Sequence, residues 1–136
     1  MSDELVIYSI ISQAALDAMK GNRGKLNAQA GHAYLHAWWD ADERFPKVAK
    51  AYRYSDAAVK VALRMVQDLD VEDIQVAGTA EDLSALYDVF HGVCGITLVR
   101  DAARTVFKKP TITFLGVGPI TKARFNELAP GLRPLL

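Results

Sequence analysis

Two apolar runs separated by a basic segment constrain the fold of this chain more than any other feature. The first run, residues 94–99, ends in Arg100 and Asp101, and the second, residues 111–117, leads into Gly-Pro. Both runs are short and almost continuously apolar, which is typical of buried β-strands. The segment between them carries basic and hydroxyl side chains: Arg104, Thr105, Lys108 and Lys109. The pattern predicts two strands joined by a basic loop, with the carboxylate of Asp101 at its base.

A third strand and a long helix are expected nearer the N-terminus. Residues 5–11 are apolar and rich in β-branched side chains, as in a buried strand, and residues 14–19 suit a helical turn. A helix is predicted to begin near Lys25 and to break or restart at Pro46. Within it, small apolar residues recur on one helical face: Leu26, Ala30, Ala33 and Ala37. Their small size predicts close packing of the helix against a sheet.

The middle and the end of the chain add further elements. Residues 57–65 alternate as in a strand but also fit a helix. Thr79 is expected to cap the helix that follows. A last helix is predicted to begin at Gly118-Pro119, because proline suits the first position of a helix, and to end at residues 130–131. The order predicts an α/β three-layer sandwich, a small mixed β-sheet of about four strands with helices on both faces.

Composition narrows the class of protein. Of the 136 residues, 51% are hydrophobic and 24% are charged, as in an ordinary globular domain. The formal net charge of +0 counts against avid non-specific binding to nucleic acid, which depends on neutralising phosphates. The basic residues cluster, however, in segments 20–25 and 100–109. If these two segments meet in space, the chain has a positive face.

The sequence predicts neither a disulfide nor a metal cluster. Cys94 is the single cysteine, and the three histidines are scattered among other residue types. The apolar runs are too short to span a membrane, and the acidic N-terminal residues lack the features of a signal peptide. A cytoplasmic location is therefore the default expectation.

Three motifs resemble those of a known enzyme family. Residues 24–33, GKLNAQAGHA, resemble the motif G-K-(I/L)-x-A-Q-x-x-H-A. Residues 99–105, VRDAART, resemble I-R-D-A-G-R-T, with Ala103 in place of the glycine, and residues 115–119, LGVGP, resemble L-G-I-G-P. These are motifs of the archaeal and eukaryotic type of peptidyl-tRNA hydrolase, the second peptidyl-tRNA hydrolase family. The order and spacing of the motifs agree with that family.

The resemblance implies a fold, an activity and a set of acting residues. It implies one peptidyl-tRNA hydrolase-like domain over residues 1–136, and it favours a strand at residues 57–65. It implies hydrolysis of the ester that joins a peptide to tRNA, which recycles stalled peptidyl-tRNA, without a metal or organic cofactor and commonly by a homodimer. The residues proposed to act in the family correspond to Lys25, Asp101, Thr105 and Thr113.

Ester hydrolysis gives these residues concrete roles. It needs an oriented water molecule, a group that takes the proton of that water, and donors for the developing oxyanion. Asp101 could orient or deprotonate the water, or it could only pair with a neighbouring arginine. Thr105 and Thr113 could bind the water or the tetrahedral intermediate. Lys25 at a helix start is unfavourable against the helix dipole, which suggests an anion nearby; the alternative is a solvated lysine.

The remaining candidates concern substrate binding. His32 is expected to hydrogen bond between helix and sheet rather than to act as a base. The side chains assigned to contact with substrate or tRNA are Lys20, Arg23, Gln29, His32, Arg104, Lys108 and Lys109. Two alternatives to the hydrolase stay open: a non-catalytic relative that binds RNA or protein through the same face, and a hydrolase of another ester or of a nucleotide conjugate.

Overall fold

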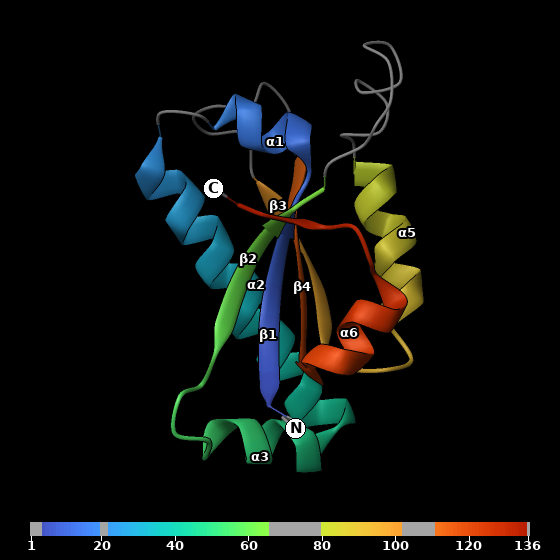
Figure 1. Ribbon diagram of the computed structural model, residues 1–136. Coiled ribbons are helices and arrows are strands. Elements are labelled where there is room, and N and C mark those ends of the chain that lie inside the picture. The colour runs from blue at the N-terminus through green and yellow to red at the C-terminus, as the bar shows by residue number, and fades with distance from the viewer. Residues whose placement is uncertain (1–3, 20–21, 66–79, 102–110, 136) are drawn as a thin grey trace.

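A mixed β-sheet forms the centre of the computed structural model, which describes residues 4–19, 22–65, 80–101 and 111–135 (Figure 1). The sheet has the strand order β3-β4-β1-β2-β5. Its strands are β1 (Leu5–Ile11), β2 (Lys60–Arg64), β3 (Ile96–Asp101), β4 (Thr111–Thr121) and β5 (Arg133–Pro134). The helices are α1 (Gln13–Ala18), α2 (Arg23–Arg44), α3 (Pro46–Arg53), α5 (Ala80–Phe90) and α6 (Lys122–Leu128).

Three strands of the sheet are parallel and two run against them. Strand β1 pairs in parallel with β2, and β4 pairs antiparallel with both β1 and β3. The parallel strands β1, β2 and β3 therefore end at the same edge of the sheet, and β4 begins there. The two-residue strand β5 pairs antiparallel with β2 and is the outermost strand on that side of the sheet.

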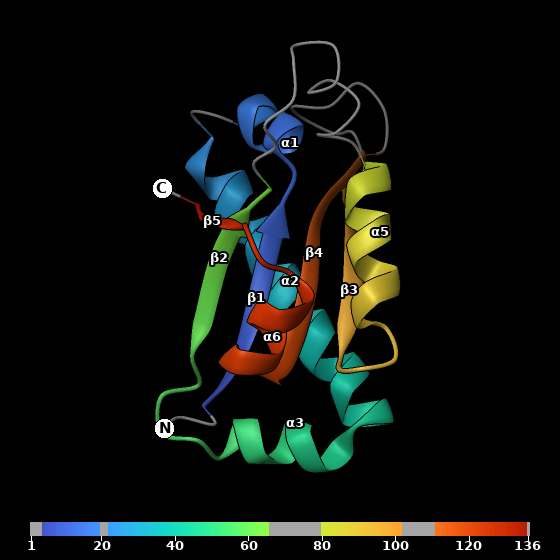
Figure 2. The same cartoon turned by 45° about the vertical axis from the view of Figure 1, so that its right-hand side comes forward.

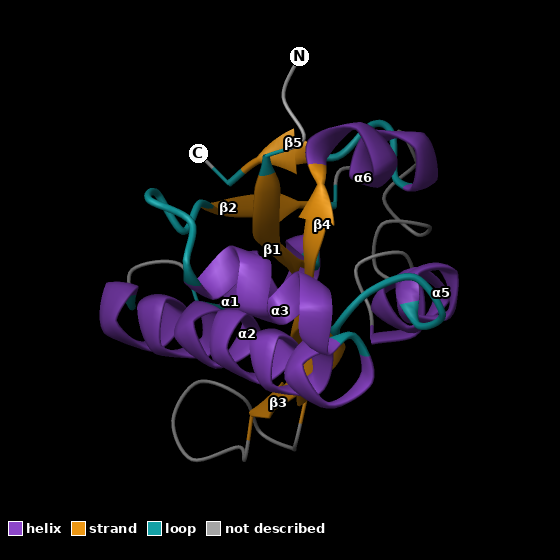
Figure 3. Ribbon diagram, turned by 90° about the horizontal axis from the view of Figure 1, so that it is seen from below, coloured by secondary structure: helices purple, strands orange, loops and turns teal. Residues whose placement is uncertain are grey.

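Helices cover both faces of the sheet (Figures 1, 2 and 3). Side chains of β1 alternate between the two faces. Val6, Tyr8 and Ile10 pack in one cluster with residues of α5 and α6, including Leu83 and Phe125. On the other face of β1, Ile7 and Ile11 pack against α1, α2 and α3 in two smaller clusters. The predicted three-layer α/β sandwich is thus confirmed.

Helix α2 lies unusually close to the sheet. Ala33, Ala37 and Ala41 on its inner face are fully buried. A Cβ atom built on Gly116 of β4 would lie 2.2 Å from the carbonyl oxygen of Ala33, and one on Gly95 would lie 2.3 Å from that of Ala37. Both separations are far inside van der Waals contact. The close packing that the small residues of this helix predict is confirmed, and glycine on the sheet makes it geometrically feasible.

Most of the predicted elements are present. The strand at 5–11, the helical turn at 14–19, and the helix restart after Phe45 agree with the structure. The ambiguous segment 57–65 contains strand β2, as the resemblance favoured. Helix α2 begins two residues before Lys25. Thr79, the expected cap of α5, lies outside the described residues.

The predicted start of the last helix at Gly118-Pro119 is wrong. Strand β4 continues through these residues to Thr121, whose hydroxyl accepts a hydrogen bond from the N–H of Arg124 at 3.3 Å and caps α6. Gly118 and Pro119 form a bulge opposite Ile7, where Gly118 has φ +126°. A Cβ on Gly118 would lie 2.5 Å from the Val6 carbonyl oxygen. Close strand pairing, and not a helix start, therefore explains this glycine.

Candidate active site

The ends of the parallel strands place several candidate residues at one edge of the sheet. Strands β1, β2 and β3 end there at Ile11, Arg64 and Asp101, and β4 begins there at Thr111, which pairs with Asp101. We call this the carboxyl edge. Helix α2 begins at the same end of the molecule (Figure 1). In open α/β sheets, ligands commonly bind at the carboxyl ends of the strands.

The prediction that Asp101 ends a strand is confirmed, because it is the last residue of β3. Its side chain lies outside the described part of the structure. The same applies to the other candidates of the loop and of the first basic segment: Thr105, Arg104, Lys108, Lys109 and Lys20. The described residues therefore do not test whether the two basic segments form one face.

A β-bulge turns Thr113 toward helix α2. Val99 pairs with Phe114 and Arg100 pairs with Ile112, so Thr113 is an extra residue on β4. In a regular strand its side chain would share a face with Leu115, which packs on the α5 side. Bulges re-aim side chains in this way and are common next to active sites.

The Thr113 hydroxyl makes a partly buried hydrogen bond to helix α2. It donates to Gln29 Oε1 at 2.9 Å, and the Val99 carbonyl oxygen lies 3.5 Å away. The Thr113 side chain is fully buried, whereas Gln29 is half-buried. This bond joins the first motif of the sequence to the strand that follows the second motif. Sequence reasoning named both residues but missed their contact, since it assigned Gln29 only to substrate binding.

The start of α2 is electropositive. Its N-cap residue is Asn22, whose Oδ1 accepts a hydrogen bond from the backbone N–H of Lys25 at 3.0 Å. The first turn contains Arg23 and Lys25 and no acidic residue. These charges add to the positive end of the helix dipole, so the helix start favours an anion. Lys25 lies one turn before Gln29, on the same side of the helix.

His32 does not make the expected hydrogen bond to the sheet within the described residues. Its side chain is exposed, and its ring packs edge-on against the ring of His36, with 5.6 Å between centroids. His36 in turn lies 5.1 Å from the ring of Trp39. The three rings form a row on the outer surface of α2, where polar residues three and four apart are neighbours.

The described residues offer neither a metal cluster nor a reactive thiol. No group of three or more His, Cys, Asp or Glu side chains among them could hold a metal ion. Cys94 is buried, and burial raises the pKa of its thiol to about 12. Its thiolate, the reactive form, is therefore scarce at neutral pH. In the part of the chain that the structure describes, no helix has the length and apolar character needed to cross a membrane.

Comparison with known proteins identifies similar chains. The family described as peptidyl-tRNA hydrolase PTH2 matches residues 9–135, a range that contains all three motifs. A probable peptidyl-tRNA hydrolase 2 of Drosophila melanogaster is 26% identical over 117 residues, which is 86% of this chain and 56% of the relative. A peptidyl-tRNA hydrolase of Methanocaldococcus jannaschii is 24% identical over 113 residues, 83% of this chain and 88% of the relative. The mitochondrial peptidyl-tRNA hydrolase 2 of Mus musculus is 27% identical over 126 residues, 93% of this chain and 62% of the relative.

Proposed function

Because this chain belongs to the peptidyl-tRNA hydrolase PTH2 family, we propose that it hydrolyses the ester bond between peptide and tRNA in peptidyl-tRNA. One observation in the structure supports the proposal: the hydrogen bond between Gln29 and Thr113 joins the first family-like motif to strand β4, which contains the third, beside the carboxyl edge. The alternative of a non-catalytic relative is less favoured, since the similar chains are named as hydrolases.

In the reaction that we propose, Asp101 orients and deprotonates a water molecule at the carboxyl edge. The water oxygen attacks the ester carbonyl, the bond to the ribose oxygen breaks, and that oxygen takes the proton that Asp101 removed from the water. The second water proton leaves with the new carboxyl group and is released to solvent. The products are a peptide with a free carboxylate and tRNA with a free hydroxyl group. The position of Asp101 at a strand end, where α2 also begins, supports this role.

Gln29 and Lys25 are proposed to stabilise the oxyanion, and Thr113 is proposed to hold the Gln29 amide in position through its hydrogen bond. Gln29 Oε1 accepts the hydrogen bond from Thr113, which leaves the two N–H donors of Gln29 Nε2 directed elsewhere. The Thr113 oxygen keeps its lone pairs for a water molecule. Lys25 and the helix dipole add positive charge one turn away. Thr105 is proposed as a second hydroxyl at the same site.

Binding of tRNA is proposed to depend on phosphate contacts around this edge. Such contacts position a nucleic acid without reading its sequence, which suits an ester common to many tRNAs. The proposed contact residues are Lys20, Arg23, Gln29, His32, Arg104, Lys108 and Lys109. We also propose that the protein works in the cytoplasm as a homodimer, which sedimentation of the purified chain would test.

The activity is tested with purified protein and an aminoacyl-tRNA whose amino group is blocked. Release of the blocked amino acid is expected in the presence of a chelator. Asp101→Asn should lower kcat by about 100-fold or more, because general base catalysis contributes about that much. Asp88→Asn, at an exposed position on α5, is the matched control. Turnover unchanged in Asp101→Asn contradicts the assigned role, and salt-dependent tRNA binding without cleavage supports the non-catalytic alternative.

A second pair of variants tests the buried hydroxyl. Thr113→Val keeps the side-chain shape but removes the donor to Gln29. We expect kcat to fall by about 100-fold, because the Gln29 amide is no longer held in position and misplacement of a catalytic group can cost this much, and we expect Thr113→Ser to restore most of it. Thr97→Val on β3 makes the same chemical change at a half-buried strand position outside the proposed site. A Thr113→Val protein with normal kcat would remove Thr113 from the mechanism.

A further inference from the structure

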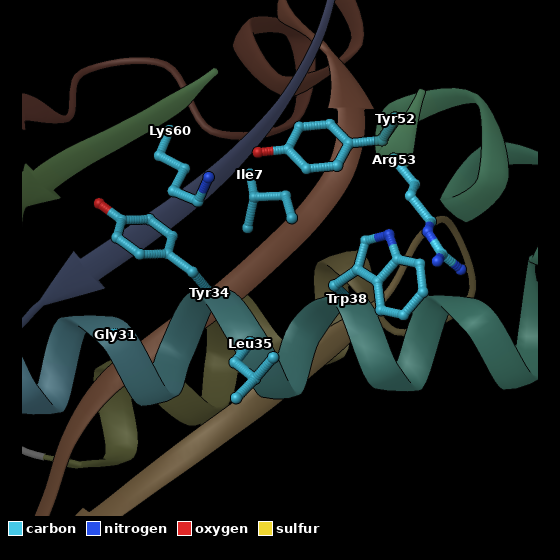
Figure 4. A pocket seen from close by; sticks show the side chains of 8 residues that line it. All are labelled: Ile7, Gly31, Tyr34, Leu35, Trp38, Tyr52, Arg53 and Lys60. Carbon is cyan, nitrogen blue, oxygen red and sulfur yellow. The ribbon is translucent and has the colours of Figure 1, made fainter. Parts of the chain in front are cut away.

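A cavity of about 460 Å³ opens beside helix α2, away from the candidate active site (Figure 4). Helix α2 contributes Gly31, Tyr34, Leu35 and Trp38 to its lining. The other walls come from β1, α3 and β2. Trp38 follows Gln29 by about two and a half helical turns and so lies on the opposite flank of α2. The cavity is open to solvent, since Leu35 is 46% exposed.

Most of the polar groups on the aromatic walls already bond within the protein. The Tyr34 hydroxyl accepts a hydrogen bond from Ser9 at 2.9 Å, and the Tyr52 hydroxyl donates to the Val59 carbonyl at 3.0 Å. The Trp38 indole N–H donates to the Ala49 carbonyl at 3.0 Å. Ring faces and aliphatic atoms therefore line the cavity, which favours an apolar body in the ligand.

The charged groups of the cavity are both cationic. Arg53 of α3 and Lys60 of β2 are exposed members of its lining. The Lys60 ammonium donates to the Ala58 carbonyl at 3.1 Å and lies 5.7 Å from the centre of the Tyr52 ring. Among the described residues, no carboxylate forms an ion pair with either cation. The cavity thus favours a ligand that carries negative charge.

We propose that this cavity binds a small amphipathic acid, which has an aromatic or aliphatic body and one carboxylate. The body lies between the rings of Tyr34, Trp38 and Tyr52, and the carboxylate lies at the rim, in the positive potential of Arg53 and Lys60, which Figure 4 shows on opposite sides of the cavity. The volume is within the usual range of small-molecule sites. This binding is independent of the proposed hydrolase activity.

The tyrosines of the cavity do not oppose an anionic ligand. Burial raises the pKa of Tyr34 above its ordinary value and raises that of Tyr52 to about 12. Both phenols therefore stay neutral at physiological pH. The positive charges at the rim act without a competing negative charge from these walls.

Three matched probes test the preference for an acid. Indoleacetate, indoleacetamide and tryptamine share one ring and differ in charge. We expect indoleacetate to bind with a dissociation constant of about 1 mM, as the usual ligand efficiency gives for its size, and tryptamine to bind at least about tenfold more weakly. The readout is the indole N–H resonance of Trp38, with exposed Trp39 as an internal control that stays unshifted.

Variants locate the binding site. Gly31→Leu should abolish binding, because a Cβ on Gly31 meets nothing within 4 Å and the larger side chain can occupy the cavity without displacing the fold. Gly92→Leu, at another glycine with open space, should bind as the original chain does. The double variant Arg53→Gln, Lys60→Gln should remove the difference between the acid and the amide. Equal binding of acid and amine, an unshifted Trp38, or unchanged binding in Gly31→Leu would overturn the proposal.

Discussion

Replacement of Gly116 by alanine should destabilise the protein and disrupt the candidate site together. The new Cβ would lie 2.2 Å from the Ala33 carbonyl oxygen, 2.8 Å from its carbonyl carbon and 2.9 Å from Thr97 Cγ2. Two of these atoms belong to the helix backbone, which a side-chain rotation cannot move. Helix α2 has to withdraw by about 1 Å to reach ordinary contact. Overpacking of this kind costs about 3 kcal/mol, the upper part of the usual range.

The same movement reaches the hydrogen bond one helical turn away. Gln29 precedes Ala33 by four residues, and its bond to Thr113 spans 2.9 Å. A withdrawal of about 1 Å stretches this bond beyond the useful limit. We therefore expect kcat to fall by about 100-fold, as a misplacement of this size can cause, beyond the effect of any unfolded fraction.

The assay combines urea unfolding with steady-state hydrolysis well below the midpoint of thermal unfolding. The free energy of unfolding should fall by about 3 kcal/mol, and Tm by about 10 °C for a chain of this length. Gly31→Ala is the control, because its Cβ meets open space in the same region; it should raise stability by up to about 1 kcal/mol, since alanine favours a helix. A Gly116→Ala protein with unchanged stability and activity would refute the close packing of α2.

Two further predictions concern titratable groups. Burial raises the pKa of Asp40, but hydrogen bonds from Arg44 at 2.6 Å and from the Ile96 N–H at 2.9 Å outweigh it and lower that pKa below 3.8. The Asp40 carboxylate therefore stabilises the fold above pH 3.8, and this stabilisation is lost as the pH falls through the folded-state pKa. Asp40→Asn should therefore reduce the loss of unfolding free energy at acid pH, measured by urea unfolding between about pH 2 and 6. An unchanged loss would contradict the hydrogen bonds of Asp40 to Arg44 and Ile96. Burial raises the pKa of the Cys94 thiol to about 12, so Cys94 should resist thiol reagents at neutral pH until the protein unfolds. Rapid labelling of the folded chain would show that Cys94 is accessible to solvent.

The strands could be predicted where burial on both faces of the sheet requires a continuous apolar run in the sequence. The strands at 5–11 and 111–117 are apolar on both sides because helices cover both faces of the sheet. Strand β5 was not predicted, since Arg133 and Pro134 have no apolar pattern and pair only because β2 lies beside them. The end of β4 was missed because a proline at residue 119 fits both a helix start and a bulge.

The candidate site could be predicted only as separate residues. Sequence spacing and resemblance named Gln29 and Thr113. Their contact depends on the pairing of Val99 and Arg100 with the next strand, which is a property of two segments and not of either alone. The cavity beside Trp38 was missed for a similar reason, because four elements build it.

The bulge at Thr113 adds a residue that the pairing of β3 with β4 does not need. If Thr113 were deleted, Ile112 and Phe114 would become consecutive and would still face Arg100 and Val99, so the ladder would close into a regular one. A chain one residue shorter is thus expected to keep the strand pairs between β3 and β4. It loses the donor to Gln29. For an engineer, this shortened chain is a scaffold in which folding can be measured without the Thr113 hydroxyl.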